Sequence, residues 1–128
     1  MKKPNEFVEH LHEVFRLFGP IRAKRMFGGY GVYHGDLMFG LVANDTLYLK
    51  VDAQSAPLFA EARSKPFEYT KNGVALKLSY SSAPVEIFDD PHAAQVWATR
   101  AYEAALRSRA KAAKAPKAPK ARPKPASG

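Results

Sequence analysis

Tight turns between short strand-like runs are the feature that most constrains how this chain can fold. Gly35-Asp36 and Asn44-Asp45 are turn dipeptides, and Asn72-Gly73 is the dipeptide most typical of a two-residue β-hairpin. Strands joined by such short connections pair antiparallel, because a parallel pair needs a crossover of a dozen or more residues. The chain is therefore predicted to be α+β, with an antiparallel sheet rather than a doubly wound one.

Five strands and three helices make up the predicted pattern. The strands are expected at about 24–34, 37–43, 46–51, 67–71 and 74–80. The helices are expected at about 5–18, 53–63 and 91–109. Asp52 is a predicted N-cap of the second helix, Asp90-Pro91 begins the third, and Trp97 should face the core. The resulting order is α-β(3)-α-β(2)-α, with helices packed on the sheet.

The segment Met26–Tyr33 is strand-like but interrupted by glycines. Gly28-Gly29 supplies backbone freedom, so a bulge or sharp bend is expected there within the first strand. A phosphate loop is one alternative, but such loops lie at the start of a helix, and here a strand follows. A base-stacking strand is another, but alternation puts Tyr30 and Tyr33 on opposite faces, which prevents the paired rings of an RNA-recognition strand. Packing in the core or an interface is favoured.

Positive charge is concentrated at the C-terminal end. The net charge is +8, yet residues 1–106 hold 12 bases and 12 acids. Residues 107–128 hold eight bases and no acid: Arg107, Arg109, Lys111, Lys114, Lys117, Lys120, Arg122 and Lys124. This Lys/Ala/Pro segment has no large apolar side chain to bury after Leu106, which predicts a disordered tail. The eight bases are the predicted nucleic-acid-binding residues, because mobile cations neutralise phosphates. A merely solubilising appendage is the alternative.

A second basic cluster, formed by Arg22, Lys24 and Arg25, precedes the glycine segment. One interpretation is a phosphate-contacting patch that includes Lys50 or Lys77. The other is a solvated strand face balanced by nearby carboxylates, which the neutrality of residues 1–106 favours. For Arg25, a buried pair with an acid is a further alternative.

The chain offers little of the chemistry that catalysis or metal binding requires. It has no cysteine, and His10 and His12 point to different sides of the expected helix, so the four histidines give no convergent ligand set. No catalytic residue, metal site or cofactor is therefore predicted. No run of about twenty apolar residues and no signal-peptide core is found, which predicts a cytoplasmic protein without membrane contact.

Several motifs, taken in order, resemble one protein family. They are Arg25-Met26-Phe27-Gly28-Gly29-Tyr30-Gly31-Val32-Tyr33, Met38-Phe39-Gly40-Leu41-Val42, Leu47-Tyr48-Leu49-Lys50-Val51-Asp52 and Pro66-Phe67-Glu68-Tyr69. Over about residues 7–106 the chain resembles the N-terminal domain of the TfoX/Sxy proteins. The resemblance implies a secretion-chaperone-like α-β(3)-α-β(2)-α domain, and it implies no catalytic residues. The residues of the family motif are Arg25, Met26, Phe27, Gly28, Gly29, Tyr30 and Gly31.

The resemblance also implies a role in regulation. TfoX/Sxy proteins are bacterial regulators of natural competence, thought to act with the cAMP receptor protein at promoters, and they usually carry a second, helical domain. Here a basic tail stands in its place. We therefore expect a non-enzymatic regulatory or adaptor module in which residues 1–106 bind a protein partner, such as the transcription machinery, and residues 107–128 contact nucleic acid. The alternatives are a small-ligand or enzymatic cleft near Arg25, Tyr30 and Tyr33, and a homodimer formed through an exposed sheet edge.

Overall fold

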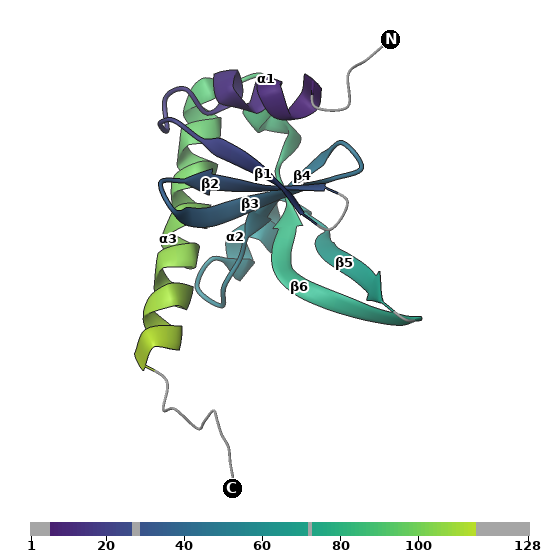
Figure 1. Ribbon diagram of the computed structural model, residues 1–128. Coiled ribbons are helices and arrows are strands. Elements are labelled where there is room, and N and C mark those ends of the chain that lie inside the picture. Colours follow the sequence, from purple (N-terminus) through teal and green to yellow (C-terminus); the bar gives the residue numbers. More distant parts are fainter. Residues whose placement is uncertain (1–5, 27–28, 72, 115–128) are drawn as a thin grey trace, which may run out of the picture.

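A six-stranded antiparallel sheet with helices packed on one face makes up the structure (Figure 1). The computed structural model describes residues 6–26, 29–71 and 73–114, without the side chains of 69–71, 74–78 and 113–114. The strands are β1 (Arg22–Met26), β2 (Gly29–His34), β3 (Leu37–Ala43), β4 (Thr46–Lys50), β5 (Pro66–Lys71) and β6 (Val74–Ser82). The helices are α1 (Glu6–Val14), α2 (Ala56–Glu61) and α3 (Pro91–Lys114), with a short 3-10 turn, η1 (Val85–Phe88), before α3.

The strand order is β1-β2-β3-β4-β6-β5, and every neighbouring pair is antiparallel. After β4 the chain passes through α2, forms the outer strand β5, and returns as β6 beside β4. Asn44 and Asp45 both have positive φ, 52° and 57°, as a type I′ hairpin turn requires. The predicted α+β class with an antiparallel sheet is confirmed.

The first predicted strand is two strands. β1 and β2 pair with each other, with Arg25 opposite Tyr30 and Met26 opposite Gly29, so the chain reverses direction between Met26 and Gly29. The observed order is α-β(4)-α-β(2)-α, which corrects the expectation of one strand through Gly28-Gly29. The sequence of β1 is mostly charged because β1 is an edge strand, and so it lacks the alternation of a half-buried strand. Phe27 and Gly28 lie outside the described residues.

The core lies between the sheet and the helices. Leu11 and Phe15, in and just after α1, are fully buried against Val32, Phe39 and Leu49 of the central strands. The rings of Phe15 and Phe39 meet edge to face, with centroids 5.7 Å apart. Burial of such side chains stabilises the fold by about 1.5–3 kcal/mol each. The sheet is therefore anchored by its central strands, β2 to β4.

The long helix α3 presents small side chains to the sheet, which lets its backbone lie close to β3 and β4. Four of its alanines are fully buried: Ala94, Ala98, Ala101 and Ala104. Trp97 is the large exception, at 6% exposed, with its ring centroid 4.9 Å from that of Phe59 and its indole N–H donating to the Glu86 carboxylate over 3.1 Å. The predicted inward position of Trp97 is confirmed. Within the described ranges, no helix combines the length and the apolar character needed to cross a membrane.

The opposite face of the sheet, which we call the open face, bears no helix in the described part of the chain. Leu41 points to this face, because it pairs with Tyr48 and is not part of the main core cluster. It is nevertheless only 2% exposed. Side chains of the strands themselves therefore cover it, and the open face has a small packed layer of its own.

The β5–β6 hairpin extends beyond the rest of the sheet (Figure 1). β6 pairs with β4 only through Tyr80, Ser81 and Ser82. From Glu68 to Lys71, β5 pairs with the first half of β6, which has no other partner strand in the described sheet. The far half of the hairpin is thus a two-stranded ribbon.

Candidate functional site

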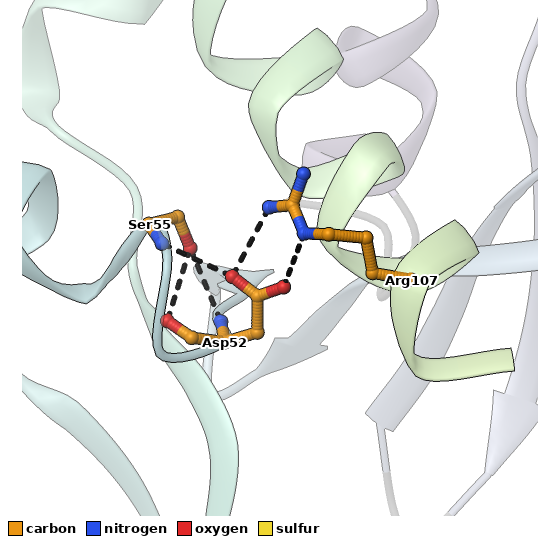
Figure 2. Close-up of polar contacts among 3 residues, drawn as sticks. All are labelled: Asp52, Ser55 and Arg107. Atoms are coloured by element: carbon orange, nitrogen blue, oxygen red, sulfur yellow. Dashed lines mark hydrogen bonds and ion pairs between the residues drawn. The ribbon is translucent and has the colours of Figure 1, made fainter. Parts of the chain in front are cut away.

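An ion pair joins α3 to the end of β4 (Figure 2). Arg107 donates from Nε to one carboxylate oxygen of Asp52 over 2.6 Å, and from a terminal nitrogen to the other over 3.1 Å. Two parallel hydrogen bonds of this kind fix orientation as well as distance. Arg107 is therefore part of the folded domain, which corrects its placement in a disordered tail.

Ser55 holds the carboxylate of Asp52 from the other side (Figure 2). The backbone N–H of Ser55 donates to Asp52 Oδ1 over 3.0 Å, and the backbone N–H of Asp52 donates to Ser55 Oγ over 3.1 Å. This reciprocal arrangement is a capping box, which satisfies two backbone donors at the start of a helical turn. The prediction that Asp52 is the N-cap of α2 is wrong, because α2 begins at Ala56 and its N-cap is Ser55. Asp52 instead caps the turn that precedes the helix.

The environment of Asp52 makes it a weak base. The hydrogen bond from Arg107 lowers the pKa of Asp52 to about 2, against the opposing effect of burial, and the Ser55 backbone N–H lowers it further. A general base needs a pKa near the operating pH. A carboxylate that is already paired and has so low a pKa is unsuited to proton transfer, so the arrangement favours a structural role for Asp52.

A cleft of about 420 Å³ opens beside this ion pair. Its polar lining includes Lys50, Asp52, Ser79, Arg107, Ser108 and Lys111. Lys50 donates from Nζ to Ser79 Oγ over 2.7 Å, and burial lowers the pKa of Lys50 although Asp52 opposes this change. Three cations thus share the cleft with one carboxylate, which Arg107 already occupies. The surplus positive charge and the hydroxyl groups suit a phosphate-like anion.

The eight predicted nucleic-acid-binding residues differ in their surroundings. Arg107 pairs with Asp52, and Arg109 lies 3.5 Å from Asp36 in the β2–β3 turn. Lys111 lines the cleft, and Lys114 is the last residue of α3. Residues 107–114 are therefore helical, which corrects the boundary expected at residue 106. The other four lie outside the described residues: Lys117, Lys120, Arg122 and Lys124.

The alternative site near Arg25, Tyr30 and Tyr33 is present only in part. Arg25 lies over the ring of Tyr30, 5.9 Å from its centroid, and both line a hollow of about 330 Å³ with Met26 and Gly29. Tyr33 points to the open face instead, where Arg22 lies 5.8 Å from its ring centroid. The structure thus brings Arg25 and Tyr30 together and separates Tyr33 from them.

The glycines of the motif allow close approach of strands. A Cβ atom at Gly29 would overlap the carbonyl oxygen of Val42, and one at Gly31 would lie 2.6 Å from the sulfur of Met26. Gly31 is followed by strand rather than helix, so its backbone does not form a helix N-terminus. Steric exclusion is the observed constraint at both positions. The backbone conformation expected at Gly28 lies outside the described residues.

His34 is a packing residue in this structure. Its ring lies 4.7 Å from that of Phe18 and 5.2 Å from that of Tyr102, and Nδ1 is 2.7 Å from the carbonyl oxygen of Pro20. Among the described residues, no group of three or more His, Cys, Asp or Glu side chains is arranged to hold a metal ion.

Two features of the site could not be found by reading along the chain. The Asp52–Arg107 pair joins residues 55 positions apart, and local patterns carry no signal for it. The spacing of Asp52 and Ser55 does carry one, because an acid and a serine three residues apart are a recognisable capping pair. The position of Lys50 beside α3 follows only from the packing of that helix on the sheet.

Comparison with known proteins agrees with this fold. A family model described as the TfoX N-terminal domain matches residues 13–105, which include all six strands and well over half of the 128 residues. A comparison with curated protein sequences finds no match. The chain therefore belongs to the TfoX N-terminal domain family.

Proposed function

We propose that this protein is a non-enzymatic regulatory or adaptor module that binds nucleic acid through the basic end of α3 and the tail that follows it. The observation that carries the proposal is the division of charge after Leu106. Arg107 and Arg109 pair with acids of the domain, whereas the six later bases follow in a segment that contains no acid. Such a segment attracts phosphates by releasing counterions from the nucleic acid.

The ion pairs of α3 determine where this charge is held. Arg107 fixes the helix beside the cleft, so Lys111 and Lys50 face the same space. A phosphate in the cleft would then lie next to the base of the tail. Contacts of this kind position a nucleic acid without reading its sequence. We place this activity in the cytoplasm, because nucleic acid is accessible there.

The proposal also includes a protein partner for the globular domain, because a regulatory role of the kind this family implies requires one. Leu17 and Val96 are apolar side chains left exposed on the helical side, and the Gln95 side chain hydrogen-bonds the backbone of Leu17. A partner would cover such a surface. Co-purification from the native cell, with and without Leu17→Ser, tests this part, and a partner retained equally by both forms would place the contact elsewhere.

Fluorescence anisotropy of a labelled DNA duplex, measured across a range of salt concentrations, tests the nucleic-acid part. Six phosphates neutralised would give a slope of log affinity against log salt of about −5 at most. The test variant is the full-length chain with six bases replaced by glutamine: Lys111, Lys114, Lys117, Lys120, Arg122 and Lys124. It should lose most of the affinity and most of the slope.

A matched control removes positive charge away from this end. Lys65→Gln alters an exposed lysine before β5 and should leave the affinity unchanged, apart from the small effect of net charge. If the variant with six glutamines kept most of its duplex affinity, the assignment of nucleic-acid binding to the end of α3 and the tail would be wrong.

A further inference from the structure

Cations and aromatic rings lie next to each other on the open face. Strand registers place Arg22 opposite Tyr33, and Lys50 opposite Tyr80, so each cation has a tyrosine as its cross-strand neighbour. Lys24 lies on the same face, because it pairs with Gly31 and its Nζ is 5.5 Å from the ring centroid of Tyr33. Lys50 Nζ is 5.3 Å from that of Tyr80.

The first four strands of the sheet offer these cations no carboxylate. β1, β2, β3 and β4 contain no aspartate or glutamate. Two of the acids at strand ends, Asp36 and Asp52, pair with Arg109 and Arg107 of α3. Arg22, Lys24 and Arg25 are exposed to solvent, as expected for a solvated strand face, but β1 to β4 themselves provide no carboxylate to balance them.

Tyr33 and Tyr80 are the tyrosines that neighbour the cations of the open face. Tyr33 and Tyr80 belong to β2 and β6, which β3 and β4 separate, so in a flat sheet their backbones would lie about 14 Å apart. Burial, with a smaller contribution from the nearby Tyr33, raises the pKa of Tyr80 to about 12. The two tyrosines are therefore within electrostatic range of each other across the open face.

We infer that the open face binds single-stranded nucleic acid, with bases stacked on Tyr33 and Tyr80 and phosphates on Arg22, Lys24 and Lys50. This inference deepens the proposed function and rests on it, since it names the form of nucleic acid that the domain prefers. Unpaired bases stack on aromatic side chains whatever their sequence, while cations beside the rings hold the backbone. Bases in a duplex stack on each other and cannot reach such rings.

Lys50 makes the two basic regions continuous. It belongs to the open face through Tyr80 and to the cleft through Ser79, and Lys111 lines the same cleft. A strand that crosses the open face from Arg22 would reach Lys50 and then the end of α3. The tail would therefore add affinity for any nucleic acid, and the open face would select the single-stranded form.

Charge argues against a second copy of the chain as the occupant. A two-fold contact places the same surface on both sides, so the three cations of one open face would lie against those of the other. No acid in β1 to β4 would offset this repulsion. An anionic polymer with flat bases complements both the charge and the rings.

The test compares an oligothymidine of about twelve nucleotides with a duplex of the same length, both labelled, on the full chain. Tyr33→Leu should weaken binding of the oligothymidine about tenfold, because it removes one stacking surface. Tyr33→Phe keeps the ring and should bind within about twofold of the parent. Duplex affinity should be the same for all three proteins, since the duplex binds through the tail.

A charge variant gives an independent readout. Lys24→Gln should weaken single-strand binding and reduce the salt slope by about one, as loss of one phosphate contact requires. Lys65→Gln is its matched control and should do neither. If Tyr33→Leu does not fold, as judged by circular dichroism, the double variant with Lys24→Gln and Arg22→Gln is used to test the inference instead.

Three results would overturn the inference. Unchanged oligothymidine affinity in Tyr33→Leu and Lys24→Gln, with duplex binding lost on neutralising the tail, would leave the proposed function standing and remove the open face from it. An equal loss of duplex and single-strand binding in Tyr33→Leu would show that the face does not select the single strand. Self-association that Tyr33→Leu abolishes, with oligothymidine affinity unchanged, would assign the face to a second copy.

Discussion

Arg107 and Asp52 are separated by 55 residues in the sequence, yet two hydrogen bonds of 2.6 and 3.1 Å join their side chains. The pair fastens the C-terminal half of α3 to the corner where β4 leads into α2. It determines which part of the basic segment belongs to the folded domain.

The first prediction concerns acid. Because the pKa of Asp52 is about 2 in the folded protein and 3.8 ordinarily, its pairing stabilises the fold fully above pH 4 and loses this contribution as the pH falls toward 2. Arg107→Gln should therefore lower the melting temperature at pH 7, and the difference from the parent should shrink between pH 4 and pH 2. Thermal melts at several pH values check this. A difference that stays constant down to pH 2 would contradict the role given to the pair.

A second prediction compares two truncations. Ending the chain after Lys114 should leave the melting temperature nearly unchanged, because residues 115–128 contain no large apolar side chain. Ending it after Leu106 should lower the melting temperature, because that cut removes the last eight residues of α3, Arg107 among them. Equal melting temperatures for the two forms would mean that the end of α3 contributes nothing to the fold.

Truncation of Trp97 tests the docking of α3. Trp97→Ala should reduce the free energy of unfolding by about 3–5 kcal/mol, since it removes a large buried ring that contacts Phe59. Val85→Ala, at a site 79% exposed, is the control and should change it by less than about 0.5 kcal/mol. Urea unfolding of both variants gives the comparison, and a loss below about 1 kcal/mol at Trp97 would show that the helix docks differently.

The motif glycines should differ in their tolerance of alanine. At Gly29 the obstacle is the backbone carbonyl of Val42, which cannot move without disturbing β3. At Gly31 the obstacle is the end of the Met26 side chain, which can adopt another rotamer. Gly29→Ala should therefore lower the midpoint of urea unfolding more than Gly31→Ala. The reverse order would show that the space at Gly29 is not what requires glycine there.

The predictable part of this fold was the part encoded by neighbouring residues. Turn dipeptides such as Asn44-Asp45 determined the antiparallel pairing, and the periodicity around Trp97 determined which side of α3 is buried. β1 was only partly predicted because an edge strand can be mostly charged, as Arg22–Met26 is with three bases in five residues. Its separation from β2 needed knowledge of the pairing across the glycines.

The candidate site was harder to predict because it depends on packing between distant elements. The bases after Leu106 were visible as a group, but nothing local distinguished Arg107, which pairs with Asp52, from Lys111, which lines the cleft. Likewise, alternation along β2 correctly separated Tyr30 from Tyr33. It could not show that Tyr33 affects the pKa of Tyr80, which belongs to a strand more than forty residues later.

The ribbon formed by the far half of the β5–β6 hairpin has a consequence for how the molecule opens. A two-stranded antiparallel pair is only marginally stable in water when no third strand or helix supports it. Its backbone amides from Glu68 to Lys71 should therefore exchange with deuterium much sooner than those of β3 and β4. Local unfolding should therefore begin at this end. The two strands of the ribbon separate there, while the core remains buried beneath α1 and α3.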